Sequence, residues 1–400
     1  NKPNRQIGTA YQQYDLLQKF RFRLSNLLEL SANFQLSTSS DVPRYGALTE
    51  RSGGQLRWAR WDYGPQTRLM GALRLQDRRP TLLYDLANYL ISHQFIEEDR
   101  ITRRAGDPLE ENNLEEVRAT NFQTDFTKSW RDWTMRYGFD VRYDAVVSEA
   151  FLKNVLIPTD QLLSLSSRYP SGGSSLAGGG LYLEAQYPLS AQWQVRGGVR
   201  YSRQQLTATF GSEDPIEWPQ AYLDGITNAE GALTSALGIR YQGKQHRWRF
   251  LLAQGFRTPN IDDFAKFRER NRRILVPNPD LSPERSLTTE IGYEIGGPTS
   301  PFRAQFTVYH TWLREVIVRR DGSLPGGQSF FVSRGDTLLV QTNDNAESAR
   351  VYGSDLVLSW HPNQHWLLRT EAHTIWGKRK QLAADGELLT LPQDHIPPPY

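Results

Sequence analysis

The feature that most constrains the fold of this chain is a repeated alternation of apolar and polar residues on either side of short turns. Apolar side chains occupy every second position at 181–187, a turn follows at 188–192, and the alternation resumes at 193–201. A period of two places successive side chains on opposite faces of a β-strand, and a short turn joins two antiparallel neighbours. This segment is therefore predicted to form a hairpin with one apolar face and one charged face.

The same pattern returns along the chain. Further hairpins are predicted at 122–141, 233–252, 287–308 and 352–370, and long polar connections separate the hairpins at 144–177, 204–231, 257–286 and 319–345. Alternate connections of an up-and-down antiparallel sheet lie at the same end of the sheet. One rim is therefore predicted to carry short turns and the other long loops, which is the asymmetry of outer-membrane barrels.

The composition agrees with strands that cross a membrane. Aromatic residues make up 12% of the chain, and no run of about twenty apolar residues is present, which excludes a helical membrane protein. A barrel strand needs only about 9–11 residues, with apolar side chains at alternate positions. Aromatic pairs bracket the short turns where an interfacial girdle is expected: Tyr187 with Trp193, Tyr241 with Trp248, and Trp360 with Trp366.

These features predict an all-β fold, an antiparallel transmembrane β-barrel with short periplasmic turns and long extracellular loops in a bacterial outer membrane. A soluble sandwich or propeller also has strands of period two. It is less favoured here, because charged residues lie in the middle of strands and the loops exceed the usual connections of a compact domain.

No enzyme chemistry is predicted. The chain lacks cysteine, a GxSxG elbow and a phosphate-binding loop, and its net charge of +3 is spread along the sequence, so neither catalysis, a cofactor nor nucleic-acid binding is expected. His361 and His365 flank a turn without the glutamate of a zinc motif, and the acidic pairs at 97–99 and 262–263 lack calcium-site spacing. No metal site is therefore predicted, and the glycine-rich run at 171–180 is expected to be a flexible loop.

Residues 256–286 resemble a known family. They contain an FRxPN-like box followed by an NPxLxPE-like box, and this pair of boxes resembles the barrel of TonB-dependent outer-membrane receptors. The segments at 41–50, 61–69, 343–356 and 396–398 are also similar to that family. The residues that carry the motif are Phe256, Arg257, Pro259, Asn260, Asn278, Pro279, Leu281, Pro283 and Glu284.

The resemblance implies that residues 1–400 are a partial receptor barrel from a 22-stranded barrel. An N-terminal plug and C-terminal strands would lie elsewhere, because the first twenty residues show neither a plug nor a signal peptide. A complete receptor would import a ferric siderophore or a similar scarce nutrient, with energy supplied through TonB. Its implied partners are the outer-membrane lipid, the TonB complex through segments missing here, the solute, and a surface lipoprotein.

Two alternatives to this function remain open. A passive porin-type channel would lack the two boxes. A haem or cobalamin receptor belongs to the same family, but haem receptors are expected to carry a histidine between the boxes, and residues 256–286 contain none.

The roles of the candidate residues also remain open. The prolines of the boxes end strands and stiffen the loop, so these residues either anchor the loop or contact the solute. The polar face of the strands is expected to line the lumen with Arg196, Arg200, Arg249, Glu290 and Arg369. These charges would either attract an anionic ferric complex or pair with a plug.

Overall fold

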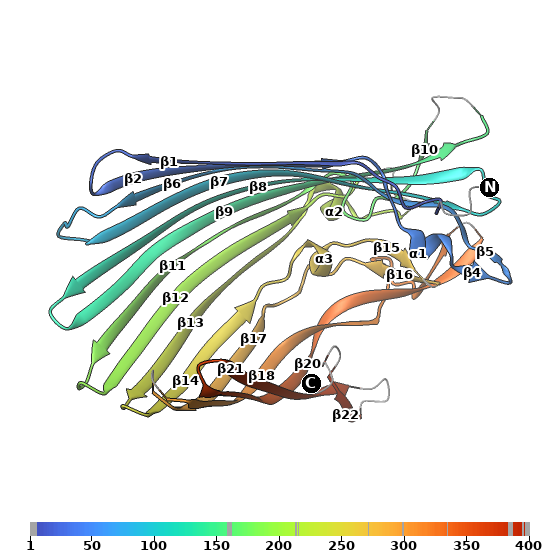
Figure 1. The fold of residues 1–400 in the computed structure, drawn as a ribbon. Coiled ribbons are helices and arrows are strands. Elements are labelled where there is room, and N and C mark those ends of the chain that lie inside the picture. Colours follow the sequence, from blue (N-terminus) through green and yellow to red (C-terminus); the bar gives the residue numbers. More distant parts are fainter. Residues whose placement is uncertain are drawn as a thin grey trace.

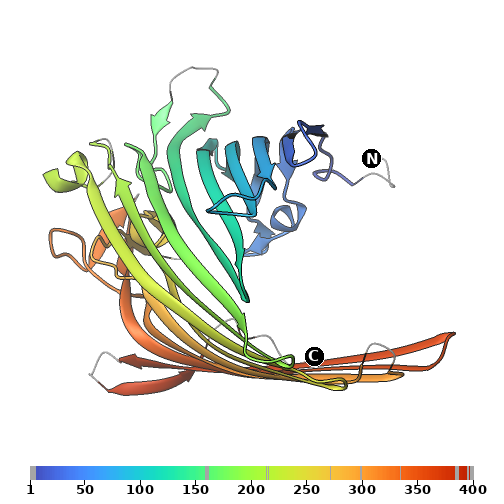
Figure 2. The ribbon, with the colours of Figure 1, turned by 90° about the vertical axis from the view of Figure 1, so that its left-hand side faces the viewer.

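The computed structural model describes residues 6–157, 162–212, 214, 216–270, 272–297, 300–333, 335–382, 387–393 and 396. Within them, 20 strands belong to one sheet and two form a small separate hairpin. The long strands lie side by side and curve into a wall (Figures 1 and 2). Their short turns gather at one end, here called the turn end, and the longer connections at the other, the loop end.

Each long strand pairs with the next one along the chain in antiparallel register. The wall consists of β1 (Gln13–Arg23), β2 (Leu28–Ser39), β6 (Trp58–Asp77), β7 (Leu86–Arg104), β8 (Leu109–Trp130), β9 (Trp133–Asn154), β11 (Ser174–Pro188), β12 (Trp193–Ala208), β13 (Ile226–Gln242), β14 (His246–Arg257), β17 (Glu284–Ile295), β18 (Phe302–Asp321), β20 (Asp336–Asn363), β21 (Trp366–Leu382) and β22 (Leu388–Pro392).

Several short elements lie at the loop end. They are β3 (Val42–Pro43), α1 (Tyr45–Leu48), β4 (Arg51–Ser52), β5 (Gln55–Leu56), β10 (Leu163–Ser164), α2 (Gln220–Asp224), α3 (Ile261–Phe264), β15 (Arg268–Arg270), β16 (Arg273–Val276) and β19 (Phe330–Ser333). No helix in the described ranges has the length and apolarity needed to cross a membrane.

The predicted fold class is confirmed. All five predicted hairpins form, as the cross-strand pairs Trp130–Trp133, Tyr187–Val195, Tyr241–Trp248, Ile295–Ala304 and Trp360–Leu368 show. The described residues contain 22 strands, and their long members form a curved wall that fits part of a large antiparallel barrel. Of the segments with family resemblance, 397 and 398 lie outside the described residues.

Three of the four predicted loops were too long, whereas the connection at 257–286 agrees with the end of β14 at Arg257 and the start of β17 at Glu284. Strand β9 continues to Asn154 and β12 to Ala208, and β20 begins at Asp336, all inside the segments that were expected to be connections. Past the membrane both faces of a strand meet water or other loops, so the apolar alternation disappears although the backbone pairing continues. Polar sequence therefore does not mark the end of these strands.

The glycine-rich run was also predicted wrongly, because Gly178–Gly180 belong to β11 rather than to a flexible loop. A Cβ atom on Gly180 would lie 2.4 Å from Nη2 of Arg200, whose side chain extends from β12 across β11 at this point. A Cβ atom on Gly179 would lie 2.5 Å from the carbonyl oxygen of Asp140. Glycine thus allows close strand packing and leaves room for an arginine inside the wall.

The outward face of the wall is an apolar band between two aromatic rows. Exposed side chains such as Leu181, Val199, Leu237, Phe250 and Ile291 form the band. Near the turn end, Trp193 lies 5.0 Å from Tyr241 and Trp248 lies 4.3 Å from Tyr293, measured between ring centroids. Toward the loop end, Tyr352 stacks on Trp376 at 5.9 Å. The interval from Trp366 to Trp376 matches the about 9–11 residues of a tilted crossing strand.

We expect Gly138→Ala to destabilise the wall, because a Cβ atom at this buried position of β9 would lie 1.9 Å from the carbonyl oxygen of Thr124. Overpacking of this kind costs about 1–3 kcal/mol. The melting temperature of the full-length protein in detergent, followed by its heat-dependent electrophoretic mobility, should fall by several degrees. Gly71→Ala is the matched control, because nothing lies within 4 Å of its added Cβ atom. Equal melting temperatures for the two variants would contradict the close packing.

Candidate functional site

The main hydrophobic core of the described residues lies among the loops of the loop end rather than inside the wall. It joins the connections that follow β12, β14 and β18, and its fully buried members include Leu206, Phe264, Ile274 and Val340. Aromatic rings fill the space between them, with Phe210 and Trp218 4.5 Å apart at their centroids. A core of this kind holds three separate loops in one fixed arrangement.

The first family box shapes the entry of the longest of these loops. Pro259 is fully buried directly after β14, and the Asn260 side chain accepts a hydrogen bond of 2.9 Å from the backbone N–H of Asp263. The Asp263 carboxylate in turn accepts from the Asn260 N–H at 3.2 Å. This reciprocal capping box starts helix α3 and directs Phe264 into the loop core.

Arg257 links the two family boxes. Its Nε donates to Oε2 of Glu284 at 2.6 Å, and its Nη1 donates to Oδ2 of Asp263 at 2.5 Å. Glu284 also accepts a hydrogen bond of 2.8 Å from the backbone N–H of Ile317 on the neighbouring strand. These contacts hold the entry and exit of the loop together, and they raise the pKa of Arg257, with the hydrogen bond to Glu284 as the main cause.

The second family box is held by amide side chains. Asn278 donates to the carbonyl oxygen of Asn343 at 2.8 Å, and Asn228 donates to the carbonyl oxygens of Pro279 and Leu281 at 3.1 and 2.7 Å. Leu281 is buried, as is Pro283. The structure thus brings both boxes into one anchored frame, apart from Phe256, which lines a groove on the outward face of the wall.

The sequence did not single out the residues that complete this frame. Asn345 donates to the carbonyl oxygens of Ser282 and Glu315, each at 2.8 Å, and accepts from the N–H of Ser282 at 2.7 Å. Asn343 donates to the carbonyl oxygen of Asp263 at 2.8 Å. Both asparagines belong to the segment 343–356 that resembles the receptor family, and that resemblance was the one available signal.

The five predicted lumen residues lie on the inward face but do not form one cluster. Each of the four arginines pairs locally with a carboxylate: Arg196 with Glu184, Arg200 with Asp140 at 2.6 Å, Arg249 with the fifth predicted residue, Glu290, at 2.9 Å, and Arg369 with Glu371 at 2.5 Å. They are spread over β12, β14, β17 and β21. The inward face is therefore a surface of ion pairs rather than a concentrated positive patch.

A different cluster at the loop end combines charge with aromatic rings. Arg168 lies 3.6 Å from the buried carboxylate of Glu115 on β8, and Lys266 lies 2.8 Å from Asp262. Arg168 and Lys266 both approach the ring of Tyr169, at 5.7 and 5.5 Å from its centroid. This cluster, here called the Tyr169 cluster, connects the β9–β11 loop with the loop that carries the family boxes.

Burial shifts the pKa values of this cluster. It raises the pKa of Glu115 and of Tyr169, and it lowers the pKa of Lys266. Burial opposes the charge of Asp262 as well, but hydrogen bonds with Lys266 and Tyr169 outweigh it and leave the pKa of Asp262 lowered. The sequence could not reveal the cluster, because residues 162–173 carry no periodic pattern or motif.

A second polar group surrounds Arg60 on β6. Its guanidinium contacts Asp41 at 2.6 Å, Asp62 at 2.6 Å and Glu110 at 3.0 Å. Beside it, Arg100 lies over the rings of Trp61 and Tyr63, at 5.7 and 5.3 Å from their centroids. Charged groups and aromatic faces together suit non-covalent binding of a polar solute.

The described side chains contain no group of three or more His, Asp or Glu residues arranged to hold a metal ion. His361 lies at the end of β20 and His365 in the adjoining turn at the turn end, and both are exposed. The backbone N–H of His365 donates to the side chain of Asn363 at 3.0 Å.

Comparison with known proteins gives a consistent picture. The family model described as "TonB dependent receptor-like, beta-barrel" matches residues 2–391. No curated protein sequence matches the chain.

Three solved structures illustrate the likeness of fold. The copper transporter OprC has a TM-score of 0.74 at 13% identity, covering 97% of this chain and 57% of its own. The Serratia marcescens hemophore receptor HasR, in complex with its hemophore and haem, has a TM-score of 0.67 at 14% identity, covering 96% and 58%. The ferric yersiniabactin uptake receptor FyuA of Yersinia pestis has a TM-score of 0.60 at 13% identity, covering 92% and 52%. The chain thus spans less than two thirds of each.

We expect Arg257→Ala to loosen the frame that joins the family boxes. Loss of two partly exposed, charge-assisted contacts should cost about 1–2 kcal/mol and speed loop opening roughly tenfold. The rate at which an added protease cleaves residues 258–283 of the full-length protein on intact cells measures that opening. Arg273→Ala removes an exposed arginine from the same loop and serves as control. If both variants are cleaved at the wild-type rate, Arg257 does not anchor the loop.

We expect the stability of the folded protein to depend on pH through Asp99. It lies in the part of β7 beyond the apolar band, and burial together with the negative charges of Glu97, Glu115 and Asp41 raises its pKa to about 6. A carboxyl group with a raised pKa in the folded state contributes most stability at low pH and loses that contribution as pH rises from about 4 to about 6.

Asp99→Asn should therefore raise the melting temperature of the full-length protein above pH 6 and have little effect near pH 4. A gain of about 1 kcal/mol is expected, because solvent screens this half-buried group. Asp132→Asn, at an exposed turn, is the control. A gain for Asp99→Asn that does not change with pH would rule out the titration of Asp99 as its cause.

Proposed function

The chain belongs to the TonB-dependent receptor β-barrel family, and on that premise we propose that it is part of an outer-membrane receptor that imports a ferric siderophore or a similar scarce nutrient. The observation that carries the proposal is the anchored loop layer at the loop end, which has its own hydrophobic core. In this receptor the loop end faces the outside of the cell. The fixed loops then form the surface that captures the solute.

Preorganisation supports a binding role for these loops. Loops that are already ordered lose little conformational entropy when a ligand binds, so more of the contact energy appears as affinity. The contacts of Arg257, Asn228, Asn343 and Asn345 supply this order. A passive channel has no need of a rigid binding surface, which favours the receptor over the porin-type alternative.

The chemistry of the loop end suits a polar ferric complex. The Tyr169 cluster and Arg100 present cationic side chains next to aromatic rings. Cationic groups attract an anionic complex, while rings pack on the flat parts of a chelator. The names of the similar structures include copper transport, haem and ferric yersiniabactin uptake, so scarce metals and their complexes are the class of solute that we propose.

In this proposal residues 1–400 act as a partial barrel domain, and a plug and a TonB-contacting segment belong to the rest of the protein. The inward ion pairs of Arg196, Arg200 and Arg249 would then exchange partners with the plug or with the passing solute. No covalent step is involved in this transport.

The proposal can be tested by growth of a deletion strain on single iron, copper or cobalamin sources, complemented by the full-length gene. We expect loss of growth on one ferric source at limiting concentration, rescued by the intact gene but not by a gene without its TonB-contacting segment. Growth on that source should also stop when a protonophore collapses the proton gradient. Equal growth on every source would leave a passive channel as the better explanation.

Lys266→Gln tests the role of the loop end within that assay. We expect the concentration of the ferric source that supports half-maximal growth to rise roughly tenfold, since a charge-assisted contact contributes about 1.5–3 kcal/mol before screening. Lys244→Gln removes a lysine from a turn at the opposite rim and should behave as wild type. If both variants match the wild type, the Tyr169 cluster does not contact the solute.

A further inference from the structure

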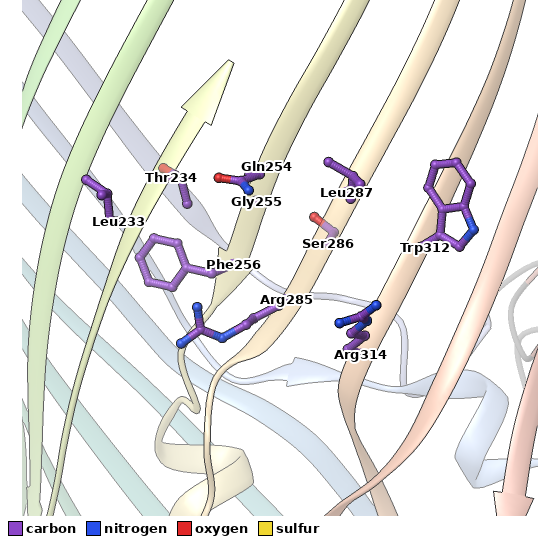
Figure 3. Close-up of a pocket in the computed structure, with 10 residues that line it drawn as sticks. All are labelled: Leu233, Thr234, Gln254, Gly255, Phe256, Arg285, Ser286, Leu287, Trp312 and Arg314. Carbon is purple, nitrogen blue, oxygen red and sulfur yellow. The ribbon is translucent and has the colours of Figure 1, made fainter. Parts of the chain in front are cut away.

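An open groove of about 400 Å³ lies on the outward face of the wall toward the loop end. Figure 3 shows Phe256, Arg285 and Arg314 at one end of it and Leu287 and Trp312 at the other. Most of its large side chains occupy the same alternate positions of β13, β14, β17 and β18 as the apolar band, whereas Thr234, Gly255 and Ser286 come from the positions between them. The groove therefore adjoins the lipid-facing surface.

Two arginines stand opposite each other in this groove. Arg285 of β17 is the direct cross-strand partner of Arg314 of β18, and both are exposed. Like charges at directly opposed positions of an antiparallel pair destabilise a sheet. Neither guanidinium takes part in an ion pair among the described side chains. On the inward face, by contrast, Arg196, Arg200 and Arg249 each have a carboxylate partner.

The positive surface extends along the next two strands. Trp312 is paired with Arg350 of β20, Arg350 with Lys378 of β21, and Lys380 lies two positions further along β21. These three cations are exposed, and the ion pairs among the described side chains do not include them. Arg285, Arg314, Arg350, Lys378 and Lys380 together are called the outer cationic row.

The aromatic row places these charges at a defined depth in the membrane. His310 is paired with Tyr352, and Tyr352 with Trp376, directly below Trp312, Arg350 and Lys378 in the register. Aromatic rows mark the boundary between the hydrocarbon and the headgroups. The outer cationic row therefore lies at the level of the headgroups of the external leaflet, with the apolar band beneath it.

We propose that the outer cationic row and its groove bind a phosphate-bearing, acylated lipid of the external leaflet. The arginines would contact the phosphate, since a guanidinium recognises phosphate through paired hydrogen bonds. An acyl chain would lie on Leu287, Trp312 and Leu233 in the groove, all of which face the lipid. The bound phosphate would also relieve the repulsion between Arg285 and Arg314.

A soluble anion would need only the charges, whereas this site adds an apolar groove that is continuous with the membrane-facing band. Basic pockets on membrane proteins at headgroup depth bind anionic lipid headgroups in this way. The surface therefore fits a lipid better than free phosphate.

The test is lipid retention by the full-length protein in detergent, measured by native mass spectrometry while bisphosphorylated lipid A is titrated. Each basic side chain near an anionic surface contributes about fivefold in affinity, so Arg285→Gln together with Arg314→Gln should weaken binding roughly 30-fold. Arg285→Lys with Arg314→Lys keeps the charges and should retain most of the affinity. Arg272→Gln with Arg273→Gln removes two exposed arginines from a loop and should bind as wild type.

Two further probes separate the sources of phosphate. Dephosphorylated lipid A should bind roughly 30-fold more weakly than the phosphorylated form, and inorganic phosphate should not compete at equal concentration. Unchanged retention by the glutamine pair, equal binding of the dephosphorylated lipid, or effective competition by inorganic phosphate would each overturn the proposal. A melting temperature no lower than that of the wild type in every variant establishes that the comparison concerns folded protein, and the glutamine pair should melt higher because it removes the repulsion between the two arginines.

Discussion

The structure depends on one constraint: in a membrane every backbone N–H and C=O group must find its partner inside the protein. A sheet that curves into a barrel wall meets this requirement by pairing each strand with both neighbours. The alternation of side chains follows from the same geometry, because one face must meet lipid and the other water. The register of the hairpins then places aromatic rings in two rows, and the rows define where the chain leaves the membrane.

The arginines on the two faces of the wall are neutralised by different partners. Inward arginines are held by carboxylates on neighbouring strands, as Arg196 and Arg249 are, or on the strand beyond the neighbour, as Arg200 of β12 is by Asp140 of β9. At the outward loop end, Arg285 and Arg314 stand side by side at headgroup depth, where anionic lipid supplies the counter-charge. The same residue type therefore has a different role according to the face and depth at which the strand places it.

Beyond the membrane the wall becomes a scaffold for loops. The loop end has the packed core that the wall lacks, and the two family boxes tie this core to β14, β17 and β20 through Arg257, Asn278 and Glu284. Packed loops on a hydrogen-bonded wall would give the proposed receptor a preformed binding surface. The boxes hold that surface in place, while the charged and aromatic groups around Tyr169 and Trp61 are the ones that we propose for solute binding.

The sequence alone determined the fold class, the hairpins and the two rims, because a period of two and an interfacial aromatic row are local patterns imposed by the membrane. It also located the family boxes, whose prolines restrict the backbone wherever they stand. Only the tertiary structure decided that Gly178–Gly180 lie in a strand, that Glu115 meets Arg168, and that Arg285 faces Arg314 with no ion pair to either among the described side chains. Those features depend on which residues the register and the folded loops bring together across long sequence separations, and no local pattern encodes such contacts.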